Sequence, residues 1–91
     1  MNKAPLSSPR LQRVLRVLRD GRPHSTREIV REAEVMAVSA CVAELRDHGA
    51  RIECVQARLG DRMVWRYTML RGPRGWQLDP ATGHWTEARR G

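Results

Sequence analysis

The spacing of the apolar residues changes along this 91-residue chain, and Gly49 marks the change. Before Gly49, apolar residues recur every three or four positions, which is the period of an amphipathic helix that buries one face. After Gly49 they alternate with polar residues, which is the period of a strand with one covered face. A chain of this length forms one domain. The sequence therefore predicts a single α+β domain, with helices first and an antiparallel hairpin after them.

Three helices are predicted, near residues 9–20, 25–34 and 37–48. The first begins at Pro9, a residue that is tolerated in a first helical turn, and ends at Gly21. The second begins at Ser25, which forms the S-x-x-E capping box with Glu28: the hydroxyl caps the Glu28 amide and the carboxylate reaches back. The third ends just before Gly49. Residues 34–36 break the pattern between the second and third helices.

A hairpin with strands near residues 51–57 and 63–70 follows Gly49. The alternation gives it one apolar face and one face that carries arginines. Its loop of about five or six residues has Arg58 and Arg62 at the ends. We expect Trp65 and Tyr67 to be core aromatics. The residues expected to be mostly buried are Leu15, Leu18, Ile29, Val42, Leu45, Ile52 and Trp65.

The two ends of the chain have a different composition. Residues 1–8 are mostly polar, with Pro5 in the stretch and Pro9 directly after it, which predicts a loose arm. Residues 71–91 are rich in Gly, Pro and Arg, and form either a small hairpin or a flexible tail. We favour the flexible tail, because an isolated hairpin is marginally stable in water. Trp76 and Trp85 in this tail are expected to clasp the core, with base stacking or a partner surface as alternatives.

Several classes of protein are disfavoured by what the sequence lacks. No apolar run approaches the roughly 18 residues of a membrane-spanning helix. The N-terminus lacks the apolar stretch of a signal peptide, so a cytoplasmic location is expected. Cys41 and Cys54 fall at apolar positions and are expected to be buried thiols. Neither a metal-binding spacing nor a catalytic set is present, so we expect no metal, no cofactor and no enzymatic activity.

The charge of the chain favours a polyanionic partner. Lys and Arg total 17 and Asp and Glu total 10, which gives a net charge of +7. All the basic residues except Lys3 are arginines, whose guanidinium group binds phosphate through paired hydrogen bonds. A GC-rich genome accounts for the Arg-to-Lys ratio equally well. The charge is uneven: residues 25–47 have a net charge of −2 and residues 51–74 a net charge of +4.

The order of these elements is that of a winged helix-turn-helix, and particular residues carry a family resemblance. About 60 of the 91 residues, from Leu11 to Leu70, resemble a helix-turn-helix family of small bacterial and prophage-encoded proteins. The matching pieces are Gly21-Arg22-Pro23-His24-Ser25-Thr26, Val38-Ser39-Ala40, Val42-Ala43-Glu44-Leu45-Arg46, Gly49, Ile52 and Tyr67. The chain departs from the family pattern at Cys41, where Arg is usual, and at Ala50, where an aromatic residue is usual.

The resemblance implies a winged fold and binding to duplex DNA, in transcriptional or phage-lifecycle control. In such a fold the third helix would present its free face to the major groove and the hairpin would be the wing. The candidate DNA-binding residues are Ser39, Ala40, Ala43 and Arg46 on the third helix, Arg58, Arg62 and Arg66 on the hairpin, and Arg13 and Arg16 on the first helix. Only Arg46 among the helical residues could bind a guanine bidentately. We therefore expect salt-sensitive binding that is dominated by phosphate contacts.

Other interpretations of the same features stay open. The arginine stripe on the first helix, from Arg10 to Arg19, is equally consistent with a solvated face. The acidic third helix could dock a protein partner without any contact to DNA. The Arg-rich wing could instead bind RNA. Formation of a homodimer would add a second DNA half-site.

Overall fold

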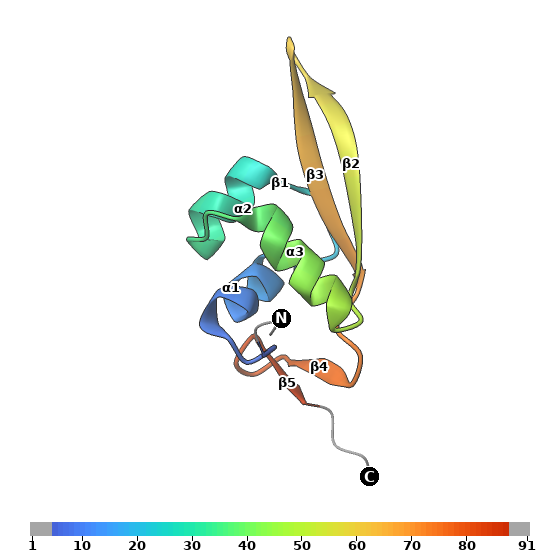
Figure 1. Cartoon of the computed structure of the whole chain (residues 1–91). Helices are drawn as coiled ribbons and strands as arrows, with labels where there is room; N and C mark the ends of the chain where they lie inside the picture. Colours follow the sequence, from blue (N-terminus) through green and yellow to red (C-terminus); the bar gives the residue numbers. More distant parts are fainter. Residues whose placement is uncertain (1–4, 88–91) are drawn as a thin grey trace.

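The computed structural model describes residues 5–87 as an α+β domain of three helices and antiparallel sheets (Figure 1). The helices are α1 (Pro9–Leu18), α2 (Thr26–Ala33) and α3 (Val38–Asp47). The strands are β1 (His24–Ser25), β2 (Arg51–Leu59), β3 (Arg62–Arg71), β4 (Trp76–Asp79) and β5 (His84–Glu87). Every predicted helix and both hairpin strands are confirmed to within two residues at each end.

Local sequence signals set the helix boundaries. The Ser25 hydroxyl accepts a hydrogen bond from the Glu28 amide at 3.1 Å, as the capping box predicts. The Glu28 carboxylate, however, pairs with the His24 side chain. Glu34 ends α2 in the left-handed conformation with φ of 54°, which separates α2 from α3 as predicted. Gly49 follows α3 with φ of 96°, and a Cβ there would lie 2.7 Å from the Arg74 Cβ, so glycine fits this position best.

The core lies between the three helices and the lower part of the sheet. All the predicted core residues except Trp65 are buried, namely Leu15, Leu18, Ile29, Val42, Leu45 and Ile52. Tyr67 is buried as expected, whereas Trp65 is 49% exposed, so its assignment to the core is wrong. Cys41 is buried but Cys54 is exposed, which corrects the expectation for the second thiol.

The main sheet has three strands in the order β1-β3-β2. The predicted extended linker at residues 22–24 contributes β1, in which His24 pairs with Tyr67 and Ser25 with Arg66. The β2–β3 hairpin extends well beyond the helices at one end of the molecule (Figure 1). Its connection is the two residues Gly60 and Asp61, and not the predicted loop of five or six. Gly60 has φ of 63° at the first turn position, where a two-residue type II′ hairpin turn requires glycine.

Both ends of the chain are more ordered than the sequence predicts. Leu6 is buried in the core, so the loose arm is wrong for residues 5–8, and residues 1–4 lie outside the described range. Strands β4 and β5 form a second hairpin against α1, at the opposite end from the β2–β3 hairpin (Figure 1). The predicted flexible tail is therefore wrong for residues 76–79 and 84–87, because this hairpin does not stand alone.

The two tail tryptophans clasp the core as predicted. Trp76 and Trp85 are partly buried against it, and the Trp85 amide donates a 3.3 Å hydrogen bond to Gln12 of α1. The Trp85 ring packs so close to Gly72 that a Cβ at this glycine would lie 2.3 Å from it. Among the described residues, no helix is both long and apolar enough to cross a membrane.

Candidate nucleic-acid interface

The β2–β3 hairpin places its side chains on two faces that its register defines. Tyr67 pairs with Cys54, Trp65 with Gln56 and Met63 with Arg58, so these pairs share one face. On the opposite face Arg66 pairs with Val55, Val64 with Ala57 and Arg62 with Leu59. The sequence therefore assigns Arg62 and Arg66 correctly to an arginine-bearing face, while Arg58 lies on the predominantly apolar face.

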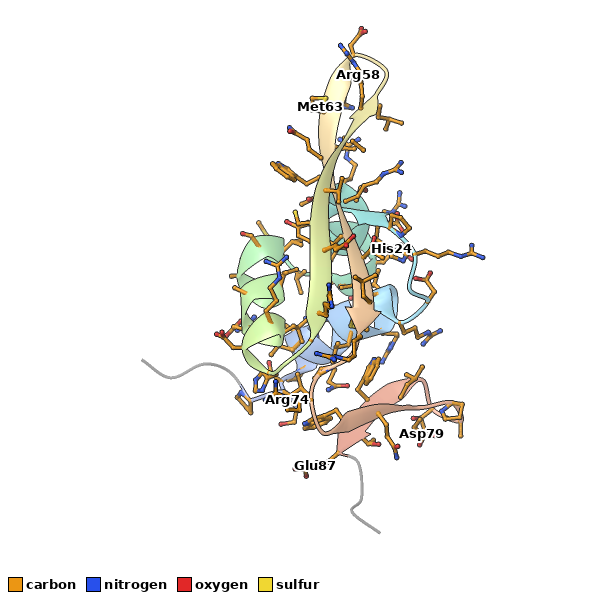
Figure 2. The ribbon with its side chains drawn as sticks, turned by 90° about the vertical axis from the view of Figure 1, so that its right-hand side faces the viewer. His24, Arg58, Met63, Arg74, Asp79 and Glu87 are labelled. Carbon is orange, nitrogen blue, oxygen red and sulfur yellow. The ribbon has the colours of Figure 1, made fainter. Side chains whose placement is uncertain are left out.

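The helices cover only the base of the apolar face. Ile52, Tyr67 and Met69 are buried there, whereas Trp65 and Met63, farther along the same face, are about half exposed. Figure 2 shows Arg58 and Met63 near the free end of the hairpin, with Met63 on the side where α3 lies. The outer half of the hairpin thus exposes Arg58, Arg62 and Arg66 together with large apolar side chains.

A groove separates this outer half from the start of α2. It has a volume of 480 Å³ and is lined by Ser25, Thr26, Arg27, Leu59, Arg62, Met63, Val64 and Trp65. Arg27 approaches from the helix and Arg62 from the hairpin. The first backbone amides of a helix have no partners within the helix, and they carry partial positive charge. The groove therefore combines two arginines with a helix N-terminus, which suits a phosphate group.

The exposed face of α3 is where the sequence predicts it. Ser39, Ala40, Ala43 and Arg46 are all exposed. The Arg46 guanidinium, however, donates to the Ile52 carbonyl from Nη2 at 2.6 Å and from Nε at 3.2 Å. This contact joins the end of α3 to the start of β2. Arg46 can bind a base only by releasing this carbonyl, and the other three side chains have little capacity to read bases.

Two of the three arginines of α1, Arg10 and Arg13, contact other helices. Arg13 Nε donates to the Ala33 carbonyl of α2 at 2.7 Å. Arg10 forms a 2.6 Å ion pair with Glu44 of α3 and donates to the Cys41 sulfur at 3.2 Å. Arg16 is exposed on the same helix. Arg13 and Arg16 are the two α1 residues predicted to bind DNA. Arg13 has a structural partner in α2, and both residues belong to α1, apart from the arginines of the hairpin.

A buried histidine clamp links α1, β1 and α2. His24 is 9% exposed, and its Nε2 lies 2.8 Å from Asp20 Oδ1 while its Nδ1 contacts Glu28 Oε2. Burial disfavours the charged imidazolium, but the hydrogen bonds to Asp20 and Glu28 outweigh burial and raise the pKa of His24 above 6.5. The hydrogen bond from His24 also lowers the pKa of Glu28 below 4.5. An imidazolium with both N–H groups donating is the state that fits this geometry.

This cluster was not predicted from the sequence, although the spacing of its residues is visible there. His24, Glu28 and Glu32 recur every fourth residue, which places them along one side of α2 and its N-terminus, and their candidate ligand atoms lie within 4.8 Å of one another. Such a set could hold a metal ion. The imidazolium has no lone pair for a metal, so binding would require the loss of its proton and of its hydrogen bond to one carboxylate.

The clamp predicts how stability depends on pH. A raised histidine pKa stabilises the folded chain at pH values below 6.5, and this contribution is lost as pH rises through the folded-state pKa. The lowered pKa of Glu28 contributes above 4.5 and is lost as pH falls. We expect the unfolding free energy measured in urea to be highest at about pH 5–6.5 and about 1 kcal/mol lower at pH 8.5. His24→Gln should remove most of this decline, and an equal decline in the variant would contradict the clamp.

Comparison of the chain with protein-family models, with curated proteins and with solved structures gave no match in any of the three. The functional proposal therefore depends on the geometry and charge of the described residues.

Proposed function

We propose that the chain is a winged helix-turn-helix protein that binds duplex DNA, with β2–β3 as the wing and α3 as the helix in the major groove. The order α1, α2, α3 and then a hairpin supports this assignment, as does the exposed face of α3. The observation that carries the proposal is a hairpin that extends past the helices with Arg58, Arg62 and Arg66 exposed.

In this proposal the phosphate backbone supplies most of the affinity. The groove between the α2 N-terminus and the hairpin would receive a phosphate between Arg27 and Arg62. The small side chains Ser39, Ala40 and Ala43 would allow α3 to approach the DNA closely, with modest sequence preference. We propose a binding protein without catalytic activity or cofactor, which acts in the cytoplasm in transcriptional or phage-lifecycle control.

One observation favours a second candidate function, the docking of a protein. A groove of 620 Å³ between α1 and α3 is lined in part by Val35, Met36, Ala40 and Ala43, and Met36 is 94% exposed. An exposed apolar side chain beside such a groove is typical of a protein-binding surface. This groove shares Ala40 and Ala43 with the proposed DNA-facing surface of α3, whereas the exposed arginines that carry the first proposal lie on the hairpin.

A titration of labelled random-sequence duplex DNA at two salt concentrations, with a structured RNA as competitor, tests the proposal. We expect duplex binding that weakens steeply between 50 and about 200 mM salt, because each neutralised phosphate releases counterions. Stronger binding to the RNA at equal salt would favour an RNA-binding wing. No duplex binding at the lower salt concentration would contradict the proposal and favour protein docking.

A further inference from the structure

We infer that the tip of the β2–β3 hairpin is an apolar wedge that enters the minor groove of duplex DNA and bends it, an inference that rests on the proposed function. The tip consists of the turn and the two cross-strand pairs next to it. Arg58 lies opposite Met63 on one face, and Leu59 lies opposite Arg62 on the other. Each face of the tip therefore presents one large apolar side chain beside one arginine.

The apolar side chains at the tip have no role in the core of the domain. Leu59 is 60% exposed and Met63 is 53% exposed. The register places both next to the turn, several residues along the hairpin from the buried Tyr67 and Met69, and Figure 2 shows Met63 near the free end. Exposed apolar surface gathered at one projecting point is typical of a site that another molecule covers.

The charge of the tip identifies the chemistry of the occupant. Arg58 and Arg62 flank the turn, and the acidic Asp61 between them leaves the tip with a net charge of +1. Because the two arginines lie on opposite faces of the ribbon, an occupant that offers anionic groups on both sides of a narrow slot would contact both of them. The minor groove does so, since a row of phosphates bounds each side of it and the edges of stacked base pairs form its floor.

The dimensions of the tip require a deformed groove. An undeformed minor groove is about 6 Å wide, which is narrower than a two-stranded ribbon whose strand axes lie about 4.8 Å apart and whose side chains extend beyond them. The tip can therefore enter only where the groove is widened, as it is when the duplex is kinked. A hairpin closed by the two residues Gly60 and Asp61 has the narrowest end that an antiparallel pair can form. Leucine and methionine are among the side chains that proteins insert between base steps, which kinks the duplex. A flat anionic membrane, by contrast, would cover only the turn or one face of the ribbon.

The wedge is tested by substitutions that remove the apolar side chains of the tip and keep its arginines. Leu59→Thr with Met63→Thr keeps strand-forming residues at exposed positions, so the fold should persist. Bending is measured by energy transfer between dyes at the two ends of a 30-base-pair duplex with a central TA step, which kinks easily. We expect the parent protein to raise the transfer, and the double variant to abolish the rise and bind about tenfold more weakly. The salt dependence should be unchanged, because the arginines remain.

Val55→Thr is the matched control. Val55 is 54% exposed on the same hairpin but pairs with Arg66, away from the tip, so this variant should bend the duplex as the parent does. Binding of the duplex by the parent without bending would overturn the wedge and leave the proposed function intact, and so would full bending by the double variant. A parent that ignores the duplex but binds vesicles of anionic phospholipid would overturn both proposals.

Discussion

Leu45→Ala should remove a large part of the folding stability of the domain. Leu45 is fully buried on the face of α3 that points into the core. Truncation of a buried leucine to alanine costs about 2–5 kcal/mol, because transfer free energy is lost and a cavity remains. A domain of this size has a total stability near the lower end of the usual range of about 5–15 kcal/mol. The loss should be visible as a melting transition shifted well below that of the parent in circular dichroism.

Ser39→Ala serves as the control for Leu45→Ala. Ser39 lies on the same helix but is exposed, so its substitution should change stability by about 0.5 kcal/mol or less. Similar melting of the Leu45→Ala variant and the parent would mean that α3 presents a different face to the core. The assignment of Ala40 and Ala43 to the DNA-facing surface would then fail as well.

Arg58→Ala combined with Arg62→Ala should have the largest effect on DNA binding. Both arginines are exposed at the tip of the hairpin, and we propose that each contacts a phosphate. Each lost phosphate contact lowers the slope of log K against log salt by about 0.9, so the slope should fall by nearly two units. Affinity at physiological salt should drop about tenfold or more, to a similar extent on all sequences. Fluorescence anisotropy over a range of salt concentrations measures both quantities.

The matched control removes the same charge from the base of the same hairpin. Arg51 and Arg71 are exposed there and lie opposite each other on the neighbouring strands, far from the tip. Arg51→Ala with Arg71→Ala should therefore leave the slope close to that of the parent. Equal slopes for the parent and the tip variant would show that the tip does not contact DNA. Equal losses from the two double variants would indicate attraction by net charge alone.

The sequence predicts the elements well because their signals are local. The capping box at Ser25, the helix end at Gly49 and the alternation after it each depend on residues that are near one another in the chain. The exposure of Trp65 was not predicted, because alternation shows which residues share a face of a strand. It does not show how much of that face other elements cover. Element lengths carry that information: a ten-residue helix spans about 15 Å and a ten-residue strand about 33 Å. A large part of the hairpin must therefore extend past the helices.

The roles of the arginines could not be predicted from the sequence. Arg13 and Arg46 are typical phosphate- or base-binding residues by type, yet both donate to backbone carbonyls. The Ala33 carbonyl becomes a neighbour of Arg13 only because α2 packs against α1, and the Ile52 carbonyl reaches Arg46 because the chain turns back after α3. The hairpin of β4 and β5 was the less favoured of the two alternatives for residues 71–91 for a related reason, because its stability depends on the contact of Trp85 with the core.

The placement of DNA on this surface is tested most directly by a nuclear magnetic resonance titration of the isotope-labelled chain with a short duplex. We expect backbone amide shifts to change at residues 57–64 of the hairpin, at Arg27 near the start of α2, and at Ser39 to Ala43 of α3. The amides of β4 and β5 should stay unchanged, because this second hairpin lies at the opposite end of the domain. Shifts that occur at β4 and β5 but not at the hairpin tip would contradict the account.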